Sequence, residues 1–247
     1  MKSKQAGFGV HAPGDERPAA ARPSFAPPQS EAELLARAAR LVGLSLGELA
    51  AKHAITPPDD LKRAKGFVGQ LLEKALGTTA STRAAPDFEE LGVELKSLPV
   101  DRRGHPVEST FVCTISLREV GESEWEKSKA WAKLRRVLWV PVEGERAIAP
   151  SQRRIGTPLI WSPSAEQEAQ LRADWDHLGT LIFAGRVDDI TAHLGTYLQV
   201  RPKAKNALAR RSYWDEEGAV TSTLPRGFYL RASFTAGILK DNFVLPR

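Results

Sequence analysis

Apolar positions between residues 30 and 77 recur every three or four residues, which predicts helices at the start of the folded chain. Two stretches with the form of a capping box, residues 30–33 and 45–48, begin the first two predicted helices. The second of these helices should end near His53. A single apolar face over residues 61–76 predicts a third helix, with Gly77 as its C-cap.

Period-two alternation dominates the middle of the chain and predicts strands at residues 92–98, 108–117, 136–144 and 158–162. On the second of these strands we expect Phe111, Cys113, Ile115 and Leu117 to share one face. The Cys113 thiol is then best explained as a small buried apolar group rather than as a nucleophile. The Lys- and Trp-rich stretch 123–136 predicts a helix between the second and third strands.

The last third of the chain combines both periodicities. It predicts a long helix from Ser164 to about Ala184, a second helix at 187–194, strands at 197–203 and 227–232, and a terminal helix capped by Ser233. Strands in the middle with helices before and after them predict an α/β or α+β fold. We expect one domain with two lobes over residues 30–247, preceded by a disordered Pro/Ala-rich tail, residues 1–29.

Composition narrows the classes of function. The formal charge of +5 and the pI of about 9.4 are compatible with a nucleic-acid partner. A single cysteine excludes an internal disulfide and a cysteine-based zinc site, so a reducing, cytoplasmic setting is expected. The five histidines show no HExxH spacing, and the chain has no GxSxG or P-loop motif and no apolar run of membrane-spanning length.

What remains as candidate chemistry is an acidic group with a lysine, Asp87, Glu94 and Lys96. Alternation places Glu94 and Lys96 on one strand face and Val93 and Leu95 on the other. Two carboxylates and the intervening backbone carbonyl of Leu95 are hard oxygen ligands suited to Mg²⁺. A bound metal can polarise a phosphodiester, and the lysine can offset charge on phosphate. The spacing alone fits a solvated strand face equally well.

The amino-acid sequence around these residues resembles that of a known family. The stretches DFEELGVELKSLPVD, LKRAKGFVGQLLEKALG, KLRRVLWVPVEGER, YLQVRPKA and LPRGFYL are similar, in order, to segments of the MutH family. That family belongs to the PD-(D/E)xK nucleases and is related to restriction enzymes of the same fold. The resemblance covers about residues 31–245. It implies a restriction-endonuclease-like fold, in which a central mixed sheet is flanked by helices and two lobes surround a DNA-binding cleft.

The resemblance also implies an activity, the Mg²⁺-dependent nicking of the unmethylated strand at hemimethylated GATC sites during methyl-directed mismatch repair. The residues at matching catalytic positions are Glu73, Asp87, Glu94, Lys96 and Lys133, and the metal ligands are Asp87, Glu94 and Leu95. Those at matching DNA-binding positions are Lys65, Gly66, Glu108, Phe111, Arg201, Pro202, Lys203 and Tyr229. The implied partners are double-stranded DNA and MutL, with MutS acting upstream. The resemblance also implies a monomer whose nuclease activity is weak without MutL and which does not bind membranes.

Without the family resemblance, several of these residues also fit other roles. Glu73 fits an exposed helix acid, and Lys133 fits a solvated basic helix face. Arg201 and Lys203 could contact phosphates rather than bases. Alternation sends one of Phe228 and Tyr229 into the core, and the six tryptophans fit core and cleft-wall packing. The rival functions are a GATC restriction enzyme that cuts both strands and a DNA-binding protein that has lost catalysis.

Overall fold

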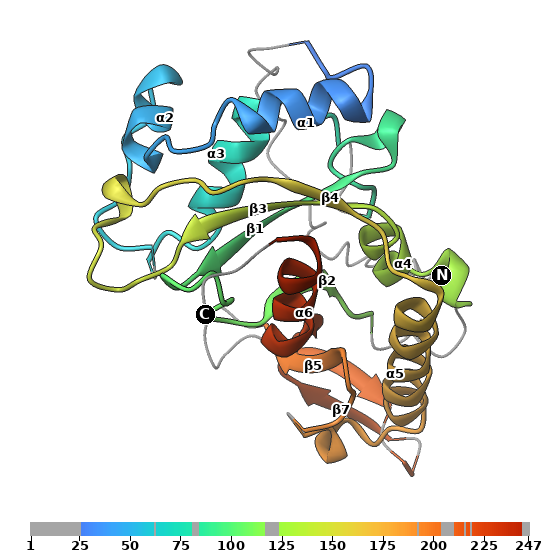
Figure 1. Cartoon of the computed structure of the whole chain (residues 1–247). Helices are drawn as coiled ribbons and strands as arrows, with labels where there is room; N and C mark the ends of the chain where they lie inside the picture. Colours follow the sequence, from blue (N-terminus) through green and yellow to red (C-terminus); the bar gives the residue numbers. More distant parts are fainter. Residues whose placement is uncertain are drawn as a thin grey trace, which may run out of the picture.

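The computed structural model describes residues 26–61, 63–80, 84–116, 124–191, 193–203, 210–214, 216–217 and 219–243. Within these ranges the strands form two three-stranded sheets and one hairpin, with helices around them (Figure 1). The predicted mixed fold of helices and strands is confirmed. The described strands lie in three sheets, of which the first is mixed and has a hydrophobic core on each face. No helix in the described part of the chain is long and apolar enough to cross a membrane.

The first sheet has the order β1-β3-β4 and contains β1 (Glu94–Val100), β3 (Val137–Glu143) and β4 (Leu159–Trp161). Strand β1 runs parallel to β3, whereas β4 is antiparallel to β3. The sheet is therefore mixed, and β1 lies at its edge. Because two parallel neighbours need a crossover connection, the chain leaves this sheet after β1 and returns to it at β3.

Helices α1 (Glu31–Ala39), α2 (Leu46–Lys52) and α3 (Phe67–Leu76) lie over one face of this sheet (Figure 1). Leu34, Leu46 and Leu72 are fully buried there against Leu138 of β3. The third helix begins at residue 67, not at 61 as the apolar pattern predicted. Its N-cap is Gly66 with φ +93°, a left-handed conformation that interrupts a helix and favours glycine.

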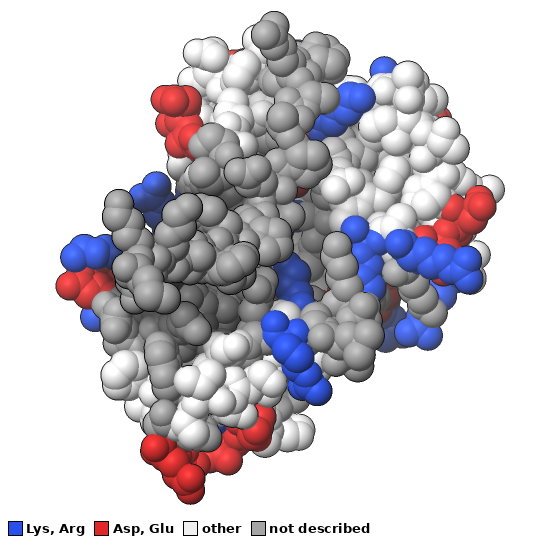
Figure 2. Space-filling view, turned by 180° about the vertical axis from the view of Figure 1, so that it is seen from behind, with Lys and Arg blue, Asp and Glu red and all other residues white. Residues whose placement is uncertain are grey.

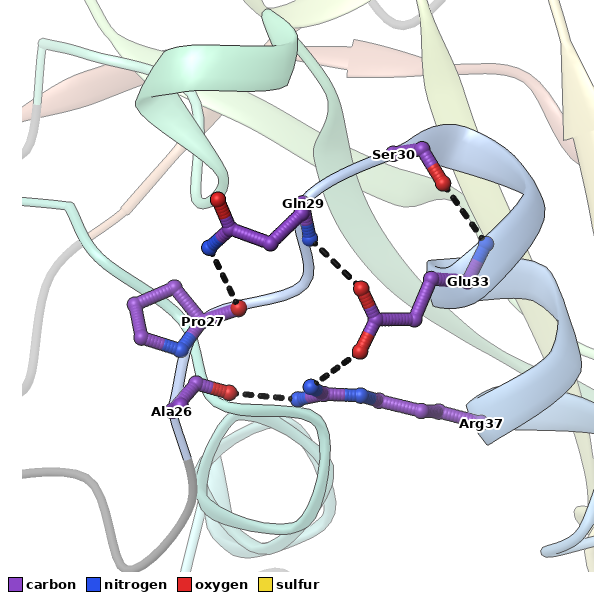
Figure 3. Close-up of polar contacts among 6 residues, drawn as sticks. All are labelled: Ala26, Pro27, Gln29, Ser30, Glu33 and Arg37. Atoms are coloured by element: carbon purple, nitrogen blue, oxygen red, sulfur yellow. Dashed lines mark hydrogen bonds and ion pairs between the residues drawn. The ribbon is translucent and has the colours of Figure 1, made fainter.

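Residues that precede α1 are fixed to it by polar contacts (Figure 3). The hydroxyl of Ser30 accepts the backbone N–H of Glu33 at 3.1 Å, so Ser30 is the predicted N-cap. The Glu33 carboxylate accepts the backbone N–H of Gln29 (2.8 Å) and pairs with Arg37 (2.5 Å). Arg37 also donates to the carbonyl of Ala26 at 2.6 Å. The last four residues assigned to the tail are thus held by α1, and residues 1–25 lie outside the described residues.

The second sheet is antiparallel throughout, with the order β2-β8-β5, and contains β2 (Thr110–Thr114), β8 (Arg226–Leu230) and β5 (Leu198–Pro202). Helices α4 (Lys129–Leu134), α5 (Ala165–Phe183) and α6 (Ala232–Asn242) pack with it in a second core, on the opposite face of β1 and β3 from α1–α3. The first sheet therefore separates two hydrophobic cores.

Several predicted elements of this half need correction. The helix predicted over 123–136 is a 3₁₀ turn (Trp125–Lys127) followed by the short α4, whose N-cap is Ser128. The helix predicted at 187–194 is only a 3₁₀ turn (Val187–Asp189), and α6 begins after Arg231 rather than at Ser233. The hairpin of β6 (Arg211–Trp214) and β7 (Val220–Thr223) was not predicted, and further 3₁₀ turns lie at Glu89–Leu91 and Pro150–Gln152.

A β-bulge in β2 reverses the predicted orientation of two side chains. Phe111 pairs with Tyr229 and Cys113 pairs with Phe228, so Val112 is the extra residue. Phe111 and Cys113 consequently point to opposite faces, and the prediction that they share one face is wrong. Cys113 is buried, as predicted, whereas Leu117 lies outside the described residues.

Candidate active site

Strand β1 carries the central acid and lysine. Glu94 and Lys96 point to the same core as Leu98, while Val93 and Leu95 point to the core under α1–α3, as alternation predicted. Neither face is solvated, because Glu94 is 4% exposed and Lys96 is 8% exposed. The alternative of a solvated strand face is therefore wrong.

One carboxylate joins two buried lysines at this point. The Nζ atom of Lys96 lies 3.0 Å from Oε1 of Glu94, and Nζ of Lys133 lies 2.7 Å from Oε2 of the same residue. Lys133 reaches the site from α4, is 5% exposed and also donates to the carbonyl of Ala85 at 2.6 Å. The structure thus brings Lys133 to Glu94, and the alternative of a solvated basic face does not hold for this residue.

Asp87 completes the group from the turn before β1. A 3₁₀ turn that ends at Gly92 (φ +64°) folds the chain back, so that Phe88 bridges to Val93 and Asp87 lies beside the strand. Its Oδ2 atom accepts the backbone N–H of Leu95 at 3.0 Å. Burial, and secondarily the negative charge of Glu94, raises the pKa of Asp87 from 3.8 to about 7.

This arrangement fits a hard divalent cation. The N–H of Glu94 bonds to the carbonyl of Arg136, just before β3, so the backbone groups of Leu95 point to the opposite, open edge of β1. The Leu95 carbonyl and Asp87 therefore share that edge. Within the described ranges no cluster of three His, Cys, Asp or Glu side chains could hold a metal ion. A cation here would be bound by two carboxylates, the backbone carbonyl and solvent, as Mg²⁺ prefers.

Glu73 is the one predicted catalytic residue that the structure does not join to this group. It lies on α3, which packs against β1, and its side chain is partly buried. Its carboxylate makes no hydrogen bond or ion pair with any residue in the described part of the chain. The alternative of a helix acid outside the cluster therefore stays open for Glu73.

Predicted DNA-binding residues gather on the second sheet. The rings of Phe111 and Tyr229 meet edge to face with centroids 5.3 Å apart, and Cζ of Arg201 lies 5.9 Å from the Tyr229 centroid. The ammonium of Lys203 lies 2.9 Å from the Phe111 centroid. Burial raises the pKa of Tyr229. The positive charge of Arg201 lowers this pKa and the negative charge of Glu108 raises it, so Glu108 also lies nearby. We call these five residues the recognition cluster.

The other predicted DNA-binding residues are placed differently. Pro202 ends β5 and is exposed beside Arg201. Lys65 and Gly66 are exposed in the turn before α3, and no contact among the described residues joins them to the recognition cluster. Phe228 is the inward-pointing member of the aromatic pair and is 3% exposed, whereas Tyr229 points outward.

The tryptophans pack as predicted where the structure describes them. Four of them, at positions 125, 139, 161 and 175, are buried, and Trp131 is partly buried against Trp125. The side chain of Trp214 lies outside what the structure describes.

Sequence reasoning missed a buried carboxylate that positions the recognition strand. Asp174 on α5 is 5% exposed and accepts the backbone N–H groups of Thr196 (2.9 Å), Tyr197 (2.6 Å) and Leu198 (2.8 Å), where β5 begins. The guanidinium of Arg231 donates to the two carbonyls just before them. Within the amphipathic pattern of α5 no local signal distinguishes Asp174 from an exposed acid.

Charge on the surface is unevenly placed. In Figure 2 the larger groups of Asp and Glu atoms lie toward the margins of the face, whereas Lys and Arg side chains also occupy its middle. The described Lys and Arg side chains of this face can contact a polyanion, with an affinity that falls as salt rises.

Comparisons with known proteins agree with these features. A family model described as "DNA mismatch repair enzyme MutH" matches residues 76–174. A protein named "DNA mismatch repair protein MutH" from Citrobacter koseri is 51% identical over 224 residues, which cover 91% of this chain and 97% of the relative. Proteins of the same name from Shigella flexneri and Escherichia coli are each 50% identical over 224 residues, which cover 91% of this chain and 98% of each relative.

Proposed function

Because this chain belongs to the MutH family of DNA mismatch repair enzymes, we propose that it nicks the unmethylated strand at hemimethylated GATC sites during methyl-directed mismatch repair. The chain is an endonuclease that acts on phosphodiester bonds of DNA. One observation carries the proposed chemistry, the buried Glu94 held between Lys96 and Lys133 beside Asp87. A protein that only binds DNA gains little from buried carboxylates, which repel phosphate.

We propose Mg²⁺ as the cofactor, held by Asp87, Glu94 and the carbonyl of Leu95. When bound, it would polarise the scissile phosphodiester and lower the pKa of a water molecule that attacks phosphorus. The support is the chemistry of the donors, which are all oxygen atoms, and the raised pKa of Asp87. A buried acid whose charged form is disfavoured gains stability from a nearby cation.

The chain's own residues orient the carboxylates and stabilise the charge that develops on the phosphate. Lys96 and Lys133 hold the Glu94 carboxylate from both oxygens, which fixes its orientation. Their positive charges, placed in a site from which most water is excluded, can offset negative charge that develops on the phosphoryl oxygens. The N–H of Leu95 orients Asp87 in the same way. Hydrolysis then breaks the bond between phosphorus and one sugar oxygen in a single strand.

Sequence recognition is assigned to the recognition cluster. Arginine and lysine can donate to guanine O6 and N7 in the major groove, where the adenine N6 also lies. A methyl group on N6 adds bulk and removes one donor hydrogen, so a packed tyrosine could reject it. Arg201 and Tyr229 lie close enough to act on one base edge together. Lys65, Gly66, Glu108, Phe111, Pro202 and Lys203 would supply the other contacts to DNA.

The proposal extends to partners and setting. By the family resemblance we expect a monomer that is weak alone and is stimulated by MutL, with MutS acting upstream, in the cytoplasm. Partial population of a competent state would explain weak activity alone. Equal nicking rates with and without MutL would contradict this part of the proposal.

The test uses a plasmid with one hemimethylated GATC site, Mg²⁺, and protein with or without MutL. We expect nicks only in the unmethylated strand, stimulated by MutL and lost in Lys96→Ala. Lys240→Ala is the matched control, because Lys240 is exposed on α6 and makes no contact with the acidic group among the described residues. Double-strand cuts would favour the restriction-enzyme alternative, and binding without cleavage under any condition would favour a DNA-binding protein.

A further inference from the structure

Hydrogen bonds join Arg201 of the recognition cluster to two further polar side chains, Ser109 and Gln199. Gln199 on β5 is 5% exposed, and its Nε2 atom donates to the hydroxyl oxygen of Ser109 at 2.9 Å. The same oxygen accepts a second hydrogen bond from Nη1 of Arg201 at 3.1 Å. Ser109 immediately precedes β2 and lies 90 residues or more from both partners along the chain.

The serine is oriented by these two bonds. A hydroxyl oxygen has two acceptor positions and one proton, and here both acceptor positions are occupied. Gln199 is buried although β5 is an edge strand, and its backbone pairs with Tyr229 of β8. Ser109 therefore links a buried amide to a charged side chain at the surface.

Within the ranges that the structure describes, Arg201 has few other contacts. It is exposed near the end of β5 and lies opposite Gly227, which offers no side chain. A side chain at Gly227 would collide with Phe111, since an added Cβ would lie 2.9 Å from its ring. Among the described residues, the guanidinium therefore contacts the Ser109 hydroxyl and the ring of Tyr229.

We propose that Ser109, anchored by Gln199, is a positioning residue that sets the specificity of the nuclease by aiming Arg201 at the base edge beside Tyr229. The inference rests on the proposed function, because it concerns how that site tells one DNA from another. An untethered arginine samples many rotamers and can contact phosphate as readily as a base. A tethered one can contact a base edge in only one geometry, so the hydroxyl contributes to discrimination and not to general affinity.

The experiment compares cleavage of four duplexes that carry a hemimethylated, an unmethylated, a fully methylated or a singly altered GATC site. Specificity is the ratio of kcat/KM for the hemimethylated duplex to kcat/KM for the fully methylated duplex and for the altered site, and the unmethylated duplex serves as a second good substrate. We expect Ser109→Ala to lower these ratios about tenfold, the effect of one hydrogen bond to a charged group. Ser109→Thr, which keeps the hydroxyl, should restore most of the loss, and the exposed Ser222→Ala on β7 should match the wild type.

Two further measurements separate positioning from a merely structural role. Affinity for DNA without a GATC site should be unchanged in Ser109→Ala. The melting temperature should fall by only a few degrees, because the buried Gln199 amide loses one partner, and the ratios are compared well below that temperature. In the Arg201→Ala background the same substitution should have no additional effect on specificity, because the serine acts through the arginine.

The outcomes are distinguishable. A wild-type protein that cleaves all four duplexes equally would refute the proposed function itself. A wild-type protein that discriminates, together with unchanged ratios in Ser109→Ala or an effect that persists without Arg201, would overturn only the role of Ser109.

Discussion

Replacing Asp87 with asparagine should stabilise the metal-free protein above neutral pH while it abolishes cleavage. Burial and the charge of Glu94 raise the pKa of Asp87 from 3.8 to about 7. Between these two values the folded state keeps a proton that the unfolded state has lost, so the free energy of unfolding falls as pH rises. At about 1.4 kcal/mol per pH unit, the full cost of ionising Asp87 in the fold is about 4 kcal/mol.

Asparagine does not titrate and therefore removes this slope. The difference in unfolding free energy between Asp87→Asn and the wild type should grow by about 3 kcal/mol between pH 5 and pH 8. The measurement is urea denaturation at several pH values in the presence of a chelator. Asp241→Asn, at an exposed site at the end of α6, is the control and should show no such growth. A difference that is flat, or that shrinks with rising pH, would refute the argument that Asp87 is held against ionisation.

A metal titration of the same two proteins extends the test. If Asp87 binds Mg²⁺, added Mg²⁺ should raise the melting temperature of the wild type at pH 8 and leave Asp87→Asn nearly unchanged. Equal stabilisation of both proteins would place the cation elsewhere. This readout does not depend on activity, so it tests the metal site separately from the nuclease reaction.

Other substitutions test other parts of the structure. Asp174→Asn should lower the free energy of unfolding, measured by urea denaturation, by about 2–3 kcal/mol, because an amide cannot accept all three backbone N–H groups. The control Asp176→Asn, at an exposed position, should have little effect. Lys133→Met should reduce single-turnover cleavage about 100-fold or more, and Lys129→Met, exposed on the same helix, should not. Since burial raises the pKa of Cys113 to about 11, its thiol should react with a disulfide reagent at pH 8 far more slowly in the folded than in the urea-unfolded protein, and equal rates would contradict its burial.

Features that depend on neighbouring residues were predicted well from the sequence. The capping box predicted at Ser45 is present, because a cap is made by side chains three residues apart. At Ser30 only the serine half of the predicted box forms, since Glu33 accepts the N–H of Gln29 instead. The start of α3 was placed six residues too early, since the apolar pattern continues through the turn. Only the left-handed Gly66 interrupts it, and a glycine within a periodic stretch does not reveal its own φ.

Features that depend on distant residues could not be predicted by pattern alone. The spacing of Glu94 and Lys96 gave their common face but not their burial, which depends on residues distant in the sequence that pack on this face. The contact from Lys133 comes from 39 residues along the chain and was indicated only by the family resemblance. The bulge at Val112 likewise depends on the register with β8 and reverses the face of every residue on one side of it.

The crossover between β1 and β3 has a consequence for how the enzyme is made. This connection carries β2 into the second sheet, where its neighbour is β8, and carries α4, which packs on β2 and delivers Lys133. During synthesis, β1, β3 and α4 leave the ribosome long before β8, which lies near the C-terminus. Pairing of such distant segments closes late. The segments that form the acidic site, β1, α4 and β3, are therefore made before the strand that completes the recognition sheet, so the two sites are completed at different stages of synthesis.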